Sequence, residues 1–134
     1  MRHRCAGSAL IEFAGSLIIV STLFSGIFQF SYGLSTYHAL VNAVRAGARY
    51  ASLQPPSPQL AEAVRNIVVY GDPAPQASAK PIAVGLTPDN VELILDHQTA
   101  TVSIRGFEVA SMFSNIKLDG RPTVTFPMNT AALK

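Results

Sequence analysis

The chain begins with one long apolar stretch and continues with shorter segments of mixed character. Residues 13–44 contain no Asp, Glu, Lys or Arg, and a run of this kind has to be buried in lipid or in protein. As a helix, the apolar residues 9–30 span about 33 Å, which is enough to cross a hydrocarbon core of about 30 Å. Because no helix breaker follows before Gln54-Pro55-Pro56, we predict one continuous helix over residues 8–53.

The second half of this helix carries two different faces. Ala39, Ala43, Gly47 and Ala51 recur at every fourth position and predict a flat stripe that lets another backbone approach closely. The alternative is that alanine serves only as a good helix former. Gly47 argues against this alternative, because glycine weakens a helix unless packing requires it. The polar residues of a second face are Asn42, Arg45 and Arg49.

Proline-rich segments frame a short second helix. Residues 55–58, Pro-Pro-Ser-Pro, predict a hinge after the long helix. Residues 59–70 carry apolar side chains on one face, and Gly71-Asp72-Pro73 predicts the end of this helix. Residues 72–90 are rich in Pro, Ala and Gly and predict a loop.

Three segments predict an antiparallel sheet, namely residues 91–95, 101–105 and 122–128. Asp96-His97-Gln98 predicts a hairpin turn between the first two. Because Pro127 cannot donate to a strand ladder, we expect the third strand to lie at a sheet edge or to end there. The segment 107–116 fits a helical turn packed on the sheet. The residues of this turn that would face the sheet are Val109, Met112, Phe113 and Ile116.

These elements predict the α+β class, with a long N-terminal helix followed by a short helix and a small antiparallel β-sheet. Residues 54–134 are few for an independent core, so this outer domain is expected to pack on the helix before it.

The charge balance argues against nucleic acid as a partner. The chain has ten Lys and Arg against eight Asp and Glu, a formal net charge of +2. Arg2 and Arg4 lie in front of the apolar run, and without residues 1–7 the two signs balance at eight each. The other basic residues form no cluster with interleaved aromatics, which nucleic-acid binding would require. By the positive-inside tendency, Arg2, His3 and Arg4 are expected in the cytoplasm and the rest of the chain beyond the membrane.

No arrangement of residues predicts catalysis. The histidines, His3, His38 and His97, have no second histidine or cysteine at metal-ligand spacing. No nucleophile elbow, P-loop or dinucleotide fingerprint occurs. The single cysteine, Cys5, cannot form an intramolecular disulfide. We therefore predict no enzyme, no metal and no cofactor, and the catalytic alternative is a membrane-tethered hydrolase acting through His97.

The first thirteen residues combine a basic leader, a glycine and an apolar helix with one early acid. Residues 1–7 read Met-Arg-His-Arg-Cys-Ala-Gly, and residues 8–13 read Ser-Ala-Leu-Ile-Glu-Phe. This order resembles the class III signal of type IV pilins and pseudopilins, and more closely that of the TadE-like minor pseudopilins of the tight-adherence (Tad/Flp) pilus system. Residues 39–51 are similar to a second family segment, in which Asn-Ala-Ala-Arg-Glu-Gly-Ala-Arg is typical. Val44 and Ala46 depart from that pattern, and the departure at Ala46 removes the usual acid.

Glu12 is the residue of this motif that physical chemistry singles out. A bare carboxylate at membrane depth costs a few kcal/mol on insertion scales, so it needs a partner or an interfacial position. The helix macrodipole favours a negative charge near the helix N-terminus by about 0.3–1 kcal/mol. Cleavage after Gly7 would create an amine on Ser8, which is a cationic partner at matching depth. The alternative is that Glu12 is an ordinary interfacial acid of a signal anchor.

The resemblance implies a pilin-like fold with three segments. Residues 1–7 would be a leader that a prepilin peptidase removes by cutting between Gly7 and Ser8. Residues 8–53 would be the long helix, with its part 9–30 in the bacterial inner membrane. Residues 54–134 would be a small extracytoplasmic domain.

The resemblance also implies a structural role in assembling a pilus for adherence. The partners would be the peptidase, other pilin or pseudopilin subunits, the inner-membrane assembly platform and the lipid bilayer, in a homo- or hetero-oligomeric filament or its base. The helices would bundle through Leu10, Phe13, Leu17 and the small-residue stripe, with Glu12 paired to an amine. The sequence leaves open whether the subunit initiates, caps or lines a filament. The alternative function is an uncleaved, single-pass signal-anchored protein with a partner-binding outer domain.

Overall fold

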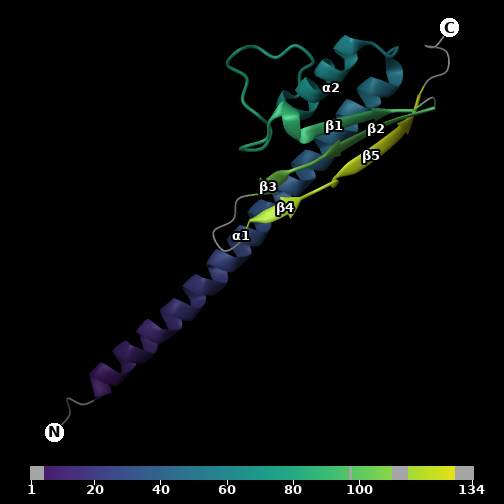
Figure 1. Ribbon diagram of the computed structural model, residues 1–134. Helices are drawn as coiled ribbons and strands as arrows, with labels where there is room; N and C mark the ends of the chain where they lie inside the picture. Colours follow the sequence, from purple (N-terminus) through teal and green to yellow (C-terminus); the bar gives the residue numbers. More distant parts are fainter. Residues whose placement is uncertain (1–4, 97, 110–114, 129–134) are drawn as a thin grey trace. The chain divides into compact units, whose positions relative to one another are not determined.

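The computed structural model describes residues 5–96, 98–109 and 115–128, and Figure 1 shows how the chain runs. The expectations that fall outside these residues are those for Arg2, His3, Arg4, His97, Met112 and Phe113.

The described residues form two helices, one 3-10 turn and five strands. The helical elements are α1 (Cys5–Leu53), α2 (Pro58–Tyr70) and the 3-10 turn η1 (Pro88–Asn90). The strands are β1 (Val91–Leu95), β2 (Thr99–Ile104), β3 (Phe107–Val109), β4 (Ile116–Leu118) and β5 (Thr123–Pro127). This order confirms the predicted α+β class.

The chain divides into two compact units, residues 1–34 and residues 35–134. In the first unit, the side chains described along α1 are nearly all exposed, including large apolar ones such as Phe24 and Phe30. A helix that is apolar on all sides has the surface expected for a helix surrounded by lipid or by other helices. The second unit holds the hydrophobic core, and this core includes the C-terminal turns of α1.

Helix α2 has a defined cap at each end. The N-terminal cap is Ser57, whose Oγ accepts a hydrogen bond from the Leu60 N–H at 3.2 Å. Pro58 occupies the first turn, where its missing N–H would have no helical partner. At the other end Gly71 adopts a φ of 79°, and its N–H donates to the Ile67 carbonyl at 2.9 Å. The predicted stop at Gly71 is therefore confirmed, with a left-handed residue that favours glycine.

Removing the N-terminal cap of α2 should destabilise the second unit. We expect Ser57→Ala to lower the free energy of unfolding by about 1 kcal/mol, because the Leu60 N–H loses the Ser57 Oγ as an acceptor and keeps only the Ser57 carbonyl at 3.1 Å. Ser57→Asp keeps an acceptor and is the matched control. Urea unfolding followed by pulse proteolysis measures both variants, and equal midpoints for Ala and Asp would show that the cap contributes nothing.

The main sheet has three antiparallel strands in the order β1-β2-β5. The first predicted strand is confirmed at Val91–Leu95, and the second begins two residues earlier than predicted, at Thr99. Asp96 closes the hairpin between them, because its N–H donates to the Thr99 carbonyl at 2.8 Å. Strand β5 lies at the sheet edge and ends at Pro127, as the proline predicted.

The helical turn predicted over residues 107–116 is wrong for the residues described there. Phe107–Val109 forms β3, which pairs antiparallel with β4 at Ile116–Leu118. Phe107 and Val109 are buried whereas Glu108 is exposed, so the burial pattern has a period of two. Gly106, with a φ of 63°, provides the turn that leads from β2 into β3.

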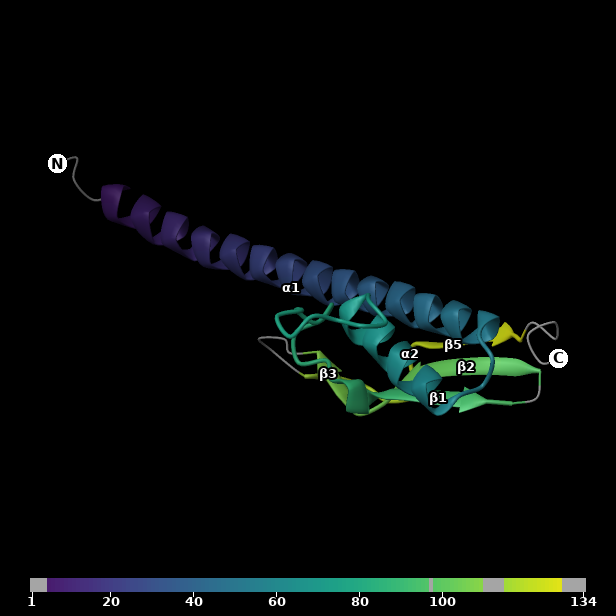
Figure 2. The same cartoon turned by 90° about the horizontal axis from the view of Figure 1, so that it is seen from above.

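The core of the second unit lies between the helices and one face of the main sheet. Figure 2 shows α2 and the C-terminal part of α1 on the same side of this sheet. The fully buried residues include Leu40, Val44, Ala48 and Ala51 from α1, Val64, Val68 and Val69 from α2, and Ala100, Val102 and Ile104 from β2.

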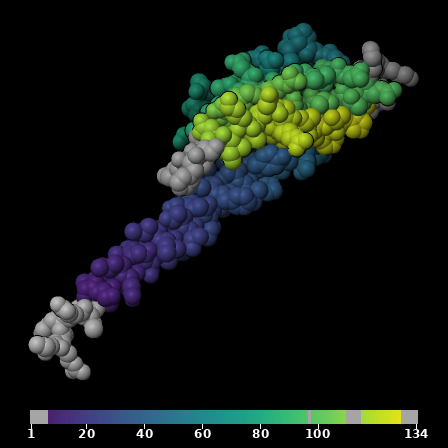
Figure 3. All heavy atoms as spheres, turned by 60° about the horizontal axis from the view of Figure 1, so that its bottom comes forward, coloured from purple at the N-terminus to yellow at the C-terminus, as the bar shows by residue number. Residues whose placement is uncertain are grey.

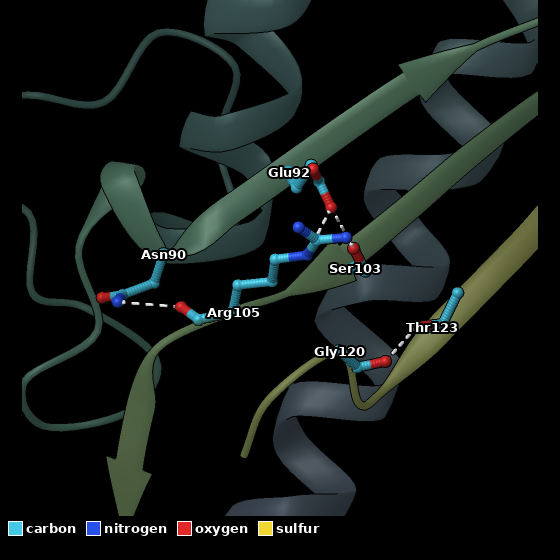
Figure 4. A network of polar contacts seen from close by, with 6 residues as sticks. All are labelled: Asn90, Glu92, Ser103, Arg105, Gly120 and Thr123. Atoms are coloured by element: carbon cyan, nitrogen blue, oxygen red, sulfur yellow. Dashed lines mark hydrogen bonds and ion pairs between the residues drawn. The ribbon is translucent and has the colours of Figure 1, made fainter. Parts of the chain in front are cut away.

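The opposite face of the main sheet is polar. Glu92 on β1 accepts a hydrogen bond from Ser103 Oγ at 3.2 Å and pairs with Arg105 Nε at 2.7 Å (Figure 4). The hydroxyls of Thr101 and Thr125 lie 2.9 Å apart across β2 and β5. Cross-strand pairs of this kind contribute roughly 0.2–1 kcal/mol each and favour one register.

Candidate assembly site

The predicted processing site lies near the start of α1. Gly7 and Ser8 are both helical and exposed. A Cβ added at Gly7 would meet no described atom within 4 Å outside the adjoining residues and the local helix backbone. The fold therefore places no steric demand for glycine at this position.

Glu12 lies two turns into the helix beside exposed apolar side chains. Its carbonyl accepts a hydrogen bond from Ser16 Oγ at 2.9 Å, which is a common helical back-bond and does not involve the carboxylate. Within the described part of the chain, the Glu12 carboxylate has no hydrogen bond and no ion pair. The neighbouring Leu10 and Phe13 are 69% and 68% exposed. The segment thus presents one acid within an apolar surface.

This segment belongs to a helix that is long and apolar enough to cross a membrane. Among the described residues it is the one helix that meets this criterion, and it lies near the N-terminus.

The small-residue stripe of α1 runs into the core of the second unit. Ala39 is half-buried, and Ala43, Gly47 and Ala51 are buried. A Cβ added at Gly47 would lie 2.6 Å from Val68 Cγ2 and 3.4 Å from Val64 Cγ1. The neighbour of the stripe at Gly47 is therefore α2 of the same chain.

The buried face of α1 is wider than the sequence pattern indicated. Leu40, Val44 and Ala48 are fully buried beside the stripe. They repeat every fourth residue, one position after Ala39, Ala43 and Gly47, so the same four-residue spacing started at Leu40 would have found them.

The polar face of α1 borders a groove. Asn42, Arg45 and Arg49 are exposed and line a hollow of about 720 Å³, together with Tyr50 of α1 and Phe126 of β5. A second hollow of about 380 Å³ shares Arg45 and is also lined by Tyr37, Arg121 and Val124. No sequence pattern linked Arg121 to Arg45, because the two residues come close only through the packing of β5 beside α1.

His38 lies outside these arrangements. Its ring packs edge-on against Tyr37 with the ring centroids 6.5 Å apart. In the described residues, no three His, Cys, Asp or Glu side chains gather as ligands for a metal ion.

Comparison with known proteins identifies the segment that carries most of these features. Residues 7–49 match the family model described as TadE-like protein. This match confirms the resemblance to TadE-like proteins over that segment and supports a protein related to the Tad pilus. No curated protein and no solved structure matches the chain.

Proposed function

We propose that this chain, TadE-like over residues 7–49, is a minor pilin or pseudopilin that assembles into a Tad-type pilus used in adherence. A prepilin peptidase cuts it after Gly7, and α1 then anchors it in the inner membrane. The N-terminus faces the cytoplasm and the domain formed by the later residues lies outside. Partners are other pilin-type subunits and the inner-membrane assembly platform.

The observation that carries this proposal is the unpartnered carboxylate of Glu12 in an exposed apolar helix. In lipid such a charge is costly, so a partner from outside the described chain has to compensate it. The new amine on Ser8 of a neighbouring subunit is a cation at the depth of Glu12. Pairing the two would set the position of one subunit against the next.

The surface around Glu12 supports packing against similar helices. Leu10, Phe13 and Leu17 are exposed along the same part of α1, and Leu17 is 55% exposed. In lipid, helices associate through close packing and polar contacts rather than through the hydrophobic effect. A single acid surrounded by exposed apolar side chains therefore favours one axial register between neighbouring helices.

The role of the protein is structural. The TadE-like family consists of pilus proteins and is structural rather than catalytic. The competing function is an uncleaved signal-anchored protein whose outer domain binds a partner. The mature N-terminus separates the two functions.

Processing gives the direct test. We expect the mature chain to begin at Ser8 in cells that contain a prepilin peptidase, and intact mass spectrometry after membrane extraction measures this. Gly7→Val should leave the precursor uncut, because a β-branched side chain would hinder the peptidase, whereas a Cβ at this position meets no described atom outside the local helix. Gly15→Val is the matched control, since position 15 is equally open in the structure and the site itself is unchanged.

An intact mass for residues 1–134 in the parent protein would contradict the processing step. If the Gly7→Val variant is cleaved as efficiently as the Gly15→Val variant, the peptidase does not recognise the glycine at position 7.

A further inference from the structure

The second unit carries two neighbouring hollows that share Arg45 and are lined by residues of α1, of the edge strand β5 and of the turn before it. The hollows measure about 720 and 380 Å³. Figure 3 shows β5, in yellow, beside the C-terminal part of α1, in blue. We name this feature the arginine groove after Arg45, Arg49 and Arg121.

The arginine groove has an unbalanced positive charge. Arg45 and Arg49 come from α1, and Arg121 comes from the turn before β5. Among the described residues, no Asp or Glu lines either hollow. In the part of the chain that the structure describes, none of the three arginines makes an ion pair or a side-chain hydrogen bond. The ion pairs of the strands lie elsewhere, between Arg105 and Glu92 and between Lys117 and Glu108.

The same groove has an apolar floor. Val124 and Phe126 of β5 are half-buried and pack against the core, and Tyr50 of α1 is half-buried beside them. Water would solvate the guanidinium groups well but would leave these apolar side chains partly exposed. An occupant that suits both would carry carboxylates together with apolar side chains.

The backbone of β5 offers a second attachment. The N–H of Ile104 donates to the Pro122 carbonyl at 3.3 Å, and the N–H of Met128 donates to the Gln98 carbonyl at 2.7 Å. In an antiparallel ladder the hydrogen-bonded positions alternate, so the backbone groups of Thr123 and Thr125 point away from β2. No described strand pairs with this edge, and an extended segment can add to such an edge as a further strand.

The spacing of the cations fits an extended segment. Arg45 and Arg49 are one helical turn apart, about 6 Å along α1. Alternate residues of a β-strand that point to the same side are about 6.8 Å apart. Carboxylates at alternate positions of an added strand can therefore reach both guanidinium groups.

We propose that the arginine groove binds an extended acidic segment of another extracytoplasmic protein. This segment adds to β5 as an edge strand and pairs alternate carboxylates with Arg45 and Arg49. The proposal rests on the proposed function in that the partner is another pilus component, and it assigns the surface that receives it. The occupant is not a second copy of this chain, because none of the described strands carries acids at alternate positions.

Peptide binding tests the groove separately from assembly. The full chain is placed in nanodiscs of phosphatidylcholine and titrated against a fluorescent peptide of alternating Glu and Val, with fluorescence anisotropy as the readout. Peptides of alternating Gln and Val and of alternating Lys and Val are the probe controls. We expect the Glu peptide to bind and the Lys peptide not to bind. The double variant Arg45→Glu/Arg49→Glu should lower the affinity for the Glu peptide by roughly tenfold or more, because both attractive charge pairs become repulsive.

Further variants distinguish the groove from net charge and from misfolding. The double variant Arg65→Glu/Lys80→Glu changes the charge by the same amount at exposed positions outside both hollows and should leave binding unchanged. Thr125→Pro removes an outward N–H of the edge strand and should weaken binding, whereas Thr125→Val keeps that N–H and should not.

Equal binding of the Glu and Gln peptides would overturn the proposal, as would a loss of binding in the Arg65→Glu/Lys80→Glu control. Binding of phosphatidylglycerol vesicles through Arg45 and Arg49 without peptide binding would assign the groove to lipid headgroups instead. If the chain self-associates and Arg45→Glu abolishes this association, the occupant of the arginine groove is a second copy of the chain. Each result leaves the processing and Glu12 experiments unaffected, so the two proposals can fail separately.

Discussion

Replacing Glu12 by Leu is expected to give a processed, membrane-retained subunit that no longer joins its complex. On the proposed function we expect the peptidase to act at Gly7 and the leader, so cleavage should not require the acid. We expect assembly to require it, because the carboxylate has no partner in the described chain and is costly in lipid until a neighbouring amine compensates it. The change therefore makes residence in the membrane easier and assembly harder.

The measurement is co-purification or crosslinking of the mature variant with other pilus components. Glu12→Gln should behave like Glu12→Leu, since it removes the charge and keeps the shape. Glu12→Asp should preserve assembly in part, because its shorter side chain reaches less far along the helix. We expect the loss for Leu and Gln to be nearly complete.

A displaced acid provides a matched control. The double variant Glu12→Leu/Ser16→Glu keeps the net charge and the helix face, but it moves the carboxylate one turn, about 6 Å, along α1. It should fail like Glu12→Leu if register matters. Full assembly of Glu12→Leu itself would make the acid an ordinary interfacial residue and remove the main physical support for the pilin mechanism.

Enlarging Gly47 is expected to produce the largest loss of stability in the second unit. A Cβ at this position would lie 2.6 Å from Val68 Cγ2, a distance that real contacts do not reach. Val68 is fully buried and β-branched, so it has little freedom to move aside. Gly47→Leu should therefore lower the free energy of unfolding by about 1–3 kcal/mol, even though leucine is the better helix former.

Two further variants separate packing from helix propensity. Ala46→Leu adds a similar volume at the adjacent exposed position and should change stability little. Val68→Ala combined with Gly47→Leu should recover part of the loss, because it removes the methyl groups that the introduced leucine meets, and a double-mutant cycle measures this coupling. Pulse proteolysis in urea on the full chain gives the midpoints. If Gly47 tolerates Leu, Phe and Glu equally, the stripe is only a run of helix formers.

The local elements were predictable where a local signal was strong. The long helix was predicted over residues 8–53 and extends over Cys5–Leu53, because the uncharged apolar run 13–44 has few alternatives to a helix and no proline follows it before Pro55. Ser57 and Gly71 mark the ends of α2 through contacts within four residues. The hairpin of β1 and β2 was predicted from alternation and a polar turn. The TadE-like match over residues 7–49 confirmed the family resemblance found from the same local motif.

Signals failed where an element depends on a distant partner. Phe107–Val109 is too short for its pattern to distinguish a strand from a helical turn, and only pairing with Ile116–Leu118 decides the matter. The start of β2 at Thr99 likewise follows from its pairing with Pro127, because an isolated strand gains nothing from two more residues.

The sequence by itself determined the long apolar helix, the position of Glu12 after Gly7 and the small-residue stripe, because each is a pattern within one continuous segment. Only the tertiary structure decided that Gly47 meets Val68 of α2, and that β5 brings Arg121 and Phe126 beside Arg45 and Arg49. Such contacts join residues far apart in the chain. They depend on which faces of the helices and strands pack together, and a periodic pattern shows that a face is apolar or polar without showing what it meets.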